Sequence, residues 1–264
     1  MIGVIAGSGR IPLEFVKNAK RKNEKIIIVG LVGEADKSIK KYVDRVYWEK
    51  VGNFNKIVEI FKKEGVKEIT LLGKVHKQNL LKKFSPDEKT LKVLKSLENY
   101  KDITLLSAII SEFEKEGIKV LPSTLFLEDL IVNEGVLTKR SPSQNEMEDI
   151  KFGFNIAKKL ADTDVGQTII VKNKMVLAVE GIEGTDETIK RGGKFGGGNA
   201  VCVKVARTNQ DLRMDVPVVG LNTIKVMKKF GVSCLAIESK KMLIIDKEEA
   251  IKLADKSDIC IVAV

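Results

Sequence analysis

Histidine is almost absent from this sequence of 264 residues, and His76 is the only one. A histidine-based catalytic triad or a metal site of several histidines is therefore nearly excluded. The three cysteines, Cys202, Cys234 and Cys260, lie in apolar runs without zinc-ligand spacing, which indicates buried thiols in a reducing cytoplasm. No apolar stretch approaches the roughly 18 to 20 residues that cross a bilayer. The first residues lack a basic segment, which predicts a structural start rather than a signal peptide.

Aromatic residues are also scarce, with one Trp and three Tyr. The formal net charge of +10 would favour a nucleic-acid partner, but few side chains could stack on bases, and no known nucleic-acid motif is present. Much of the excess charge is lysine on predicted helical faces. We expect no nucleic-acid partner, and a basic surface suited to polyanionic nucleotides or an anionic membrane leaflet.

What the sequence does contain is a regular alternation of strand and helix patterns over its first half. Strands of this length alternating with amphipathic helices are typical of a parallel sheet covered on both faces. The expected strands are residues 2–6, 25–31, 45–48, 68–72 and 118–121, and the expected helices are 11–22, 54–63, 86–97 and 104–116.

The periodicity lapses at residues 134–145, where glycine, serine and proline accumulate. We interpret this segment as a linker between an N-terminal domain of residues 1–133 and a C-terminal domain of residues 146–264. The second domain has more strands, as expected for a mixed α/β fold. Its expected helices are 146–159, 222–230 and 247–256, and its expected strands are 166–171, 175–180, 200–206, 234–237, 242–246 and 259–262.

A glycine turn follows the first predicted strand, at Gly7, Ser8 and Gly9. Glycines let the main chain approach a phosphate, and the helix N-terminus that follows favours anions. The turn is not the dinucleotide fingerprint, which requires a third small residue and an acid near the end of the second strand. Phosphate binding and an ordinary tight turn therefore both remain open here.

Acidic residues gather where predicted strands of the second half end. Glu180 closes an apolar strand and glycines flank Glu183, an arrangement from which oxygen-ligand metal sites are assembled. The alternative is structural, with Thr185 capping a helix and Asp186 complementing its dipole. The following residues 191–198 contain five glycines and two cations, which indicates either a phosphate-binding lid or a flexible surface loop.

The most informative segment is residues 210–217, Gln-Asp-Leu-Arg-Met-Asp-Val-Pro. As a strand, it would place Asp211, Arg213 and Asp215 on one face and the apolar Leu212 and Met214 on the other. Carboxylates are preferred Mg²⁺ ligands, and arginine matches phosphate oxygens. The alternative is a solvated edge strand with a local ladder of ion pairs.

Four motifs together resemble a known family: Gly-x-Ile-Ala-Gly-Ser-Gly-x-x-Pro at residues 3–12, Asp-Val-Gly-Gln at 164–167, Glu-Gly-x-x-Gly-Thr-Asp at 180–186, and Gln-Asp-x-Arg-x-Asp-x-Pro-x-x-Gly at 210–220. They are similar to the UDP-2,3-diacylglucosamine pyrophosphatases of lipid A biosynthesis, of the type unrelated to calcineurin-like phosphoesterases. The turn at residues 73–75 also fits this family. The glycine-rich residues 194–199 depart from it.

This resemblance implies a Rossmann-like N-terminal domain linked to a distinct α/β C-terminal catalytic domain. It also implies Mg²⁺-dependent hydrolysis of UDP-2,3-diacylglucosamine to UMP and 2,3-diacylglucosamine 1-phosphate, with Mn²⁺ as an alternative ion. The acid at Asp215 is the one that the family implies as essential. We accordingly expect Asp215, Asp211 and Arg213 to be catalytic, Gly7, Ser8, Gly9, Gln167, Thr185, Arg191 and Gln210 to bind substrate, and Asp215, Asp211, Asp186 and Glu183 to bind metal.

An amphiphilic substrate adds two expectations, an apolar cleft for its acyl chains and peripheral contact of a cytoplasmic protein with the inner membrane leaflet. The sequence leaves open whether the protein forms a homo-oligomer. The main competing interpretation is a non-catalytic protein that binds a nucleotide sugar or a dinucleotide, in which the acids are structural.

Overall fold

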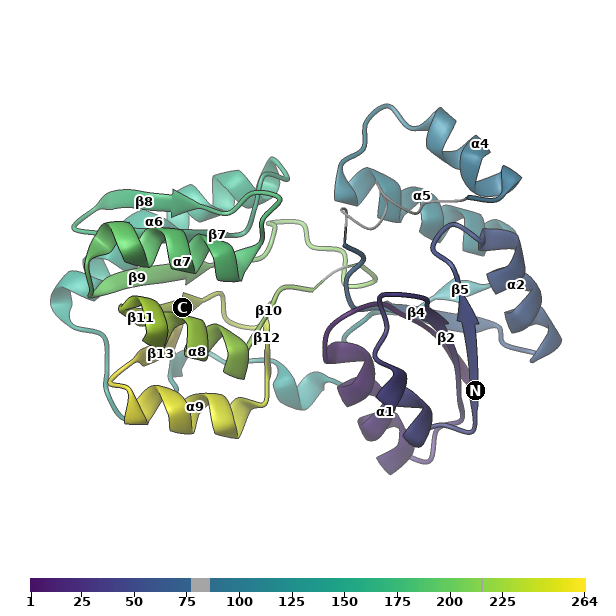
Figure 1. The fold of residues 1–264 in the computed structure, drawn as a ribbon, viewed down its shortest axis with the longest axis horizontal. Coiled ribbons are helices and arrows are strands. Elements are labelled where there is room, and N and C mark those ends of the chain that lie inside the picture. The colour runs from purple at the N-terminus through teal and green to yellow at the C-terminus, as the bar shows by residue number, and fades with distance from the viewer. Residues whose placement is uncertain (77–85, 215) are drawn as a thin grey trace. The chain divides into compact units, whose positions relative to one another are not determined.

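The computed structural model describes residues 1–76, 86–214 and 216–264, which form two compact units (Figure 1). Unit 1 contains the described parts of Met1–Glu128 and Asp211–Asp215, and unit 2 contains Asp129–Gln210 and Val216–Val264. Unit 1 has a parallel sheet and unit 2 a separate mixed sheet, each flanked by helices. The predicted α/β class, with a parallel N-terminal sheet and a mixed C-terminal one, is confirmed.

The sheet of unit 1 has the strand order β3-β2-β1-β4-β5, and all its pairs are parallel. This is the order of a doubly wound sheet, in which β1 and β4 flank the switch point where the direction of winding reverses. Every residue of β1 and β2 is buried, as expected for central parallel strands. The strands are β1 (Ile2–Ala6), β2 (Ile26–Leu31), β3 (Arg45–Glu49), β4 (Glu68–Leu72) and β5 (Lys119–Val120).

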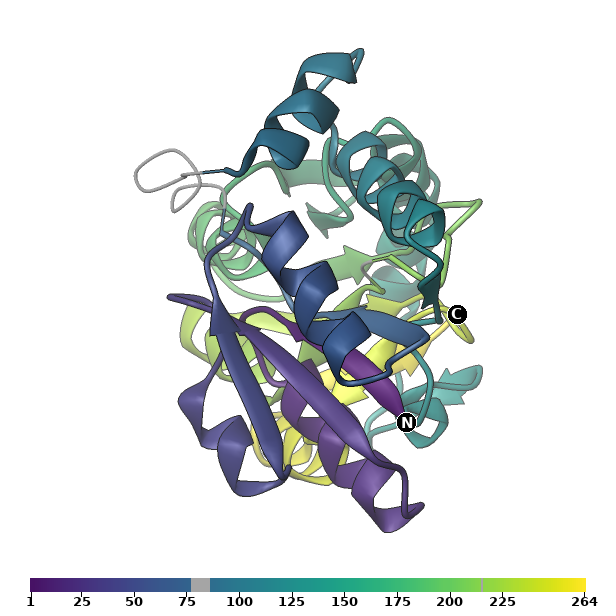
Figure 2. The same cartoon turned by 90° about the vertical axis from the view of Figure 1, so that its right-hand side faces the viewer.

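Helices flank this sheet, with α1 on one side and α2 and α5 on the other (Figure 1). Phe61 of α2 and Phe113 of α5 are fully buried in a core with strand residues such as Ile5 and Ile69. Figure 2 shows unit 1 from the front, with α4 at the top. The helices are α1 (Ile11–Arg21), α2 (Phe54–Lys63), α4 (Glu88–Ser96) and α5 (Asp102–Lys115), with short 3₁₀ turns at Lys37–Lys41 and Glu128–Leu130.

The sheet of unit 2 has the order β6-β13-β11-β9-β7-β8. Its strands β9, β11 and β13 run parallel to one another, whereas β6, β7 and β8 pair antiparallel with their neighbours. The strands are β6 (Gly135–Val136), β7 (Thr168–Lys172), β8 (Met175–Val179), β9 (Ala200–Lys204), β11 (Val232–Ile237) and β13 (Cys260–Ala263), and β10 (Val218–Gly220) pairs in parallel with β12 (Leu243–Ile245).

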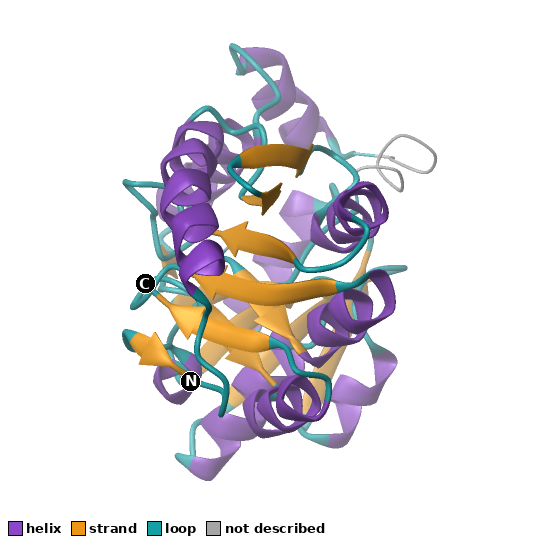
Figure 3. Cartoon of the chain, turned by 90° about the vertical axis from the view of Figure 1, so that its left-hand side faces the viewer, coloured by secondary structure: helices purple, strands orange, loops and turns teal. Residues whose placement is uncertain are grey.

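Unit 2 is a three-layer arrangement, with helices on both sides of its strands (Figure 3). The core on one face joins α6 (Gln144–Asp162) to β7, β9 and β11. The core on the other face joins the same strands to α7 (Thr185–Gly196), α8 (Leu221–Phe230) and α9 (Lys247–Lys256). In the part of the chain that the structure describes, none of the helices is both long and apolar enough to cross a membrane.

The expected linker at residues 134–145 lies within unit 2. Its β6 pairs with β13, and Ser143 caps α6 through a capping box with Glu146. The chain passes from unit 1 to unit 2 after Glu128 and returns to unit 1 with the segment that begins at Asp211. The expected division into domains of residues 1–133 and 146–264 stays a prediction.

Among the described residues, the strand predicted for residues 210–217 is wrong, because residues 211–214 form a turn. The Asp211 carboxylate accepts the main-chain N–H of Arg213 (2.9 Å), and the N–H of Met214 donates to the carbonyl of Asp211 (3.0 Å). Aspartate competes in this way with the regular pairing of a strand. The expected burial of Leu212 beside Met214 fails as well, since Leu212 is 44% exposed and Met214 is buried.

The buried carboxylate of Glu146, at the start of α6, should make the free energy of unfolding depend on pH. Burial raises the pKa of Glu146, but the hydrogen-bonded Arg140 guanidinium, the Ser143 N–H and the Ser233 hydroxyl lower it to about 2. This pKa lies below the ordinary value of 4.5. The contribution of ionised Glu146 to the free energy of unfolding is therefore complete above pH 4.5 and is lost as the pH falls towards 2. Urea unfolding should show Glu146→Gln about 2 kcal/mol less stable at pH 7, with a smaller deficit at pH 3.

Glu148→Gln is the matched control, because Glu148 lies on the same helix but its side chain is 45% exposed and forms an ion pair only with Lys174 in the structure described. Its effect should stay within about 0.5 kcal/mol at both pH values. Equal destabilisation by the two substitutions would contradict the assignment to the buried Arg140 network.

Candidate functional site

The glycine turn after β1 is locked against the turn after β4, at the switch point of unit 1. The N–H of Ser8 donates to the carbonyl of Lys74 (2.8 Å), and the N–H of Lys74 donates to the carbonyl of Ser8 (3.0 Å). A Cβ on Gly7 would lie 2.5 Å from the Lys74 carbonyl oxygen, and one on Gly73 would lie 2.4 Å from that of Ser8. Only glycine fits at either place, so the two turns form one rigid structure at the carboxyl edge of the sheet.

This edge carries the features that an anionic ligand requires. Gly9 has a φ of 94°, and the chain then enters α1 at Ile11, whose first turn contains Pro12. The N-terminus of a helix leaves main-chain N–H groups without intrahelical partners and carries partial positive charge. Ligands of open α/β sheets bind outside the carboxyl ends of the strands at such a switch point. The predicted substrate residues Gly7, Ser8 and Gly9 therefore lie where a phosphate could bind.

A second polar cluster lies in unit 2, where β9 ends and β7 begins. The buried Lys204, at the end of β9, donates to the hydroxyls of Thr168 (3.2 Å) and Thr185 (2.7 Å). Its ammonium lies 3.8 Å from the carboxylate of the buried Glu180. Glu180 also accepts the hydroxyl of Thr185 (2.8 Å) and the N–H of Gln167 (3.2 Å). The predicted substrate residues Gln167 and Thr185 thus belong to one network.

The charge of Glu180 is set by this network. Burial raises the pKa of Glu180, but the Lys204 ammonium and the hydrogen bonds that the carboxylate accepts outweigh burial and hold the pKa below its usual value. Glu180 is therefore an ionised carboxylate within the protein at neutral pH. Because both of its oxygens have partners, its role in the structure is to hold the start of α7 and the residue before β7 to the end of β8.

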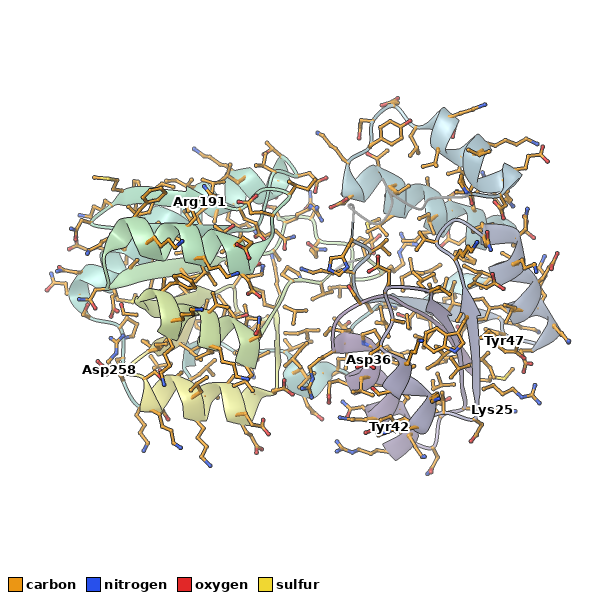
Figure 4. The ribbon with its side chains drawn as sticks, viewed as in Figure 1. Lys25, Asp36, Tyr42, Tyr47, Arg191 and Asp258 are labelled. Carbon is orange, nitrogen blue, oxygen red and sulfur yellow. The ribbon has the colours of Figure 1, made fainter. Side chains whose placement is uncertain are left out.

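The start of α7 gathers the other acids of this motif. Asp186 accepts the side-chain amide of Asn222 from α8 (2.6 Å). Glu183 accepts the N–H of Gly181 (3.1 Å) and pairs with Arg191, which also donates to the carbonyl of Val179 (2.7 Å). Burial raises the pKa of Glu183, but main-chain N–H groups and Arg191 bring it below the usual value. Figure 4 labels Arg191 on α7.

The glycine-rich residues 191–198 are neither a lid nor a loop for most of their length, since α7 continues to Gly196. A Cβ on Gly192 would lie 2.4 Å from Ile170, and one on Gly193 would lie 2.3 Å from the carbonyl oxygen of Phe230. These glycines let the helix pack closely on β7 and on α8. The prediction failed because sequence alone does not distinguish a glycine of close packing from one of a flexible loop.

The chain that follows β9 is anchored to the end of α6. Arg207 pairs with Asp164, and Thr208 donates from its N–H (2.7 Å) and its hydroxyl (2.8 Å) to Asp162. The side chain of Gln210 accepts the N–H of Arg207 (3.3 Å). Gln210, predicted to bind substrate, therefore also shapes this segment immediately before the chain enters unit 1.

The predicted catalytic pair Asp211 and Arg213 lies in unit 1 and is joined by a two-pronged salt bridge. The Arg213 guanidinium donates to both Asp211 oxygens (2.8 to 3.1 Å) and to Glu114 (2.9 Å). These hydrogen bonds hold the pKa of Asp211 below its usual value. The Ser123 hydroxyl fixes the turn through the carbonyls of Leu212 and Met214 (3.0 Å each). Asp215 lies outside the described residues.

Among the described residues, no three His, Cys, Asp or Glu side chains form a group that could hold a metal ion. Asp211 belongs to unit 1, whereas Glu183 and Asp186 belong to unit 2. Their predicted binding of one ion together with Asp215 stays a prediction.

Lys204 and Arg207 are two of the residues in these networks that the sequence analysis did not predict. Lys204 interrupts the apolar run of residues 200–206, Ala-Val-Cys-Val-Lys-Val-Ala. A charged residue inside a buried strand requires a partner, so this interruption was a detectable signal. Arg207 has no comparable local signal, since its partner Asp164 lies 43 positions earlier in the chain.

Comparisons with known proteins agree on one family. Residues 1–130 match the family model described as LpxI N-terminal domain, and residues 133–262 match the LpxI C-terminal domain. UDP-2,3-diacylglucosamine pyrophosphatase LpxI from Caulobacter vibrioides is 29% identical over 265 residues, which cover 96% of this chain and 94% of that protein.

Similarity to solved structures is weak. A UDP-glucose-4-epimerase from Stenotrophomonas maltophila matches with a TM-score of 0.29 and 11% identity, over 44% of this chain and 34% of that one. A biotin carboxylase from Campylobacter jejuni matches with a TM-score of 0.29 and 15% identity, over 73% and 41%.

Proposed function

Because the chain belongs to the LpxI family, we propose that it hydrolyses the pyrophosphate bond of UDP-2,3-diacylglucosamine in lipid A biosynthesis. The products would be UMP and 2,3-diacylglucosamine 1-phosphate. The observation that carries this proposal is the match of both halves of the chain to the two family domains, supported by the name of the relative from Caulobacter vibrioides.

The described residues supply part of what this reaction requires. Attack of water on a pyrophosphate requires that charge on the phosphoryl oxygens be neutralised and that the phosphates be held in line with the nucleophile. The rigid turns at Gly7 and Gly73, with the N-terminus of α1, offer main-chain donors for a phosphate. Arg213, held by Asp211, is a cation in a fixed orientation and a second candidate for phosphate contact.

Magnesium is the ion that we propose for this chemistry, with Mn²⁺ as a substitute. Mg²⁺ is commonly held by one or two carboxylates together with substrate phosphates and water. The Asn222 amide donates to one oxygen of Asp186 (2.6 Å), and among the described residues no group donates to the other, so this carboxylate fits that mode of binding. The carboxylates that we propose as candidate ligands are those of Asp186 and Glu183 within unit 2, and that of Asp211 within unit 1 together with Asp215 of the same sequence motif. When bound, the ion would polarise the phosphoryl oxygens.

The decisive assay follows release of UMP from UDP-2,3-diacylglucosamine by the purified protein, with and without EDTA. We expect release in the presence of Mg²⁺, loss of release in EDTA, and recovery when excess Mg²⁺ or Mn²⁺ is added. Undiminished release in EDTA would contradict the proposed metal but support hydrolysis. Saturable binding of the nucleotide sugar without any release of UMP would favour the alternative, a non-catalytic binding protein.

A further inference from the structure

The only histidine of the chain lies at the same edge of unit 1 as the glycine turns. His76 follows β4 by four residues, and Glu34 lies in the turn that follows β2. Both are therefore at the carboxyl ends of parallel strands, where open α/β sheets bind ligands. His76 is also two residues beyond Lys74, whose main chain is fixed to Ser8 in both directions.

Glu34 holds His76 in one orientation. One Glu34 oxygen accepts the main-chain N–H of His76 (3.1 Å), and the other lies 2.7 Å from the ring nitrogen Nδ1. The side chain of Glu34 is 1% exposed, whereas that of His76 is 62% exposed. A carboxylate at Nδ1 requires a proton there, because an ionised carboxylate can only accept. Nε2 is therefore the nitrogen that the ring has left for another partner, as acceptor when neutral and as donor when protonated.

If the contact between Glu34 and His76 served only to anchor the loop, it would not require this arrangement of the ring. The hydrogen bond from the main-chain N–H of His76 to Glu34 would already fix the loop without the imidazole. Burial of a carboxylate, in contrast, is costly unless it is paired. A buried acid that aligns an exposed imidazole is instead the arrangement by which proteins fix the tautomer of a functional histidine.

We propose that His76, as the imidazolium, donates from Nε2 to a phosphate of the bound nucleotide, and that Glu34 is the positioning residue that orients the ring. The exposed Lys74 on the same segment and the main-chain donors of the glycine turns add to the preference of this edge for an anion. This inference rests on the proposed function for the identity of the nucleotide, and UMP is the probe.

A single histidine makes the direct test unambiguous, because its ring gives one set of NMR signals. In protein labelled with ¹³C and ¹⁵N histidine, the neutral ring should carry its proton on Nδ1, and Glu34→Gln should abolish this preference. Titration with UMP should shift the ring signals to saturation. Ring signals that stay unchanged at saturating UMP, with binding verified by calorimetry, would overturn the contact.

Three variants separate a phosphate contact from a structural role. His76→Gln should weaken UMP binding by about tenfold or more, since hydrogen bonds to charged groups are among the stronger ones. His76→Arg keeps a cation with donors and should recover most of that loss. Glu34→Gln should weaken binding less than His76→Gln does. Unfolding midpoints of all three identify any variant that loses binding by failing to fold.

Outcomes for this inference and for the proposed function remain distinguishable. If the wild-type protein hydrolyses UDP-2,3-diacylglucosamine while His76→Gln keeps an unchanged KM and unchanged UMP affinity, the contact is overturned and the hydrolase stands. If the wild-type protein releases no UMP, the proposed function fails, and the NMR titration with UMP still decides the role of His76. Equal loss of affinity in His76→Gln and His76→Arg would also count against a phosphate contact.

Discussion

Replacement of Asp215 by Asn should lower the turnover of UDP-2,3-diacylglucosamine by about 10² to 10⁴ while substrate binding largely survives. The change keeps the shape of the side chain and removes its charge. Loss of one group that stabilises the transition state or transfers a proton typically lowers the rate by a factor in this range. The prediction rests on the family motif at residues 210–220 and on steady-state kcat and KM measured with folded protein.

Asp258→Asn is the matched control for this experiment. The Asp258 side chain is 89% exposed, and its backbone has a φ of 53°, which asparagine tolerates well. The same chemical change there should leave kcat unchanged. It should alter the free energy of unfolding by no more than about 0.5 kcal/mol. Near-normal turnover of Asp215→Asn would show that its carboxylate is structural, and the search for the essential acid would then turn to Glu183 and Asp186.

Replacement of Lys204 by Met should be the most destabilising of the proposed changes, at about 3 to 5 kcal/mol. Methionine fills a similar volume but leaves Glu180 buried without its cation, and it removes a donor from Thr185 and Thr168. Removing one member of a buried ion pair leaves an uncompensated charge in a medium of low polarity. Chemical denaturation at pH 7 measures the loss.

The double variant Lys204→Met/Glu180→Gln identifies the cause of that loss. If the unpaired charge of Glu180 is responsible, neutral glutamine should restore more than half of the lost free energy, since a whole buried pair can often be replaced at little cost. A double variant as unstable as the sum of the two single ones would show instead that the hydrogen bonds of Lys204 to the threonines dominate.

Most of the fold could be predicted because its elements depend on local patterns. The apolar run of residues 2–6 and the periodicity of residues 54–63 coincide with β1 and α2. The turn at Asp211 could not be predicted from alternation, because a hydrogen bond from main chain to side chain overrides it. The site was predicted less completely, since residues such as Thr168 and Lys204 become neighbours only through the register of β7 and β9.

The path of the chain through its two units determines how the molecule can be divided. A fragment that ends at Glu128 would contain every helix of unit 1 but would lack the returning segment 211–215. It would lose Met214 from its core, and the N–H and hydroxyl of Ser123 would lose the carbonyl acceptors that they have in the intact chain. No single cut of the chain therefore yields two complete units. In fragment complementation, the C-terminal fragment would have to supply residues 211–215 to the unit formed by the N-terminal fragment.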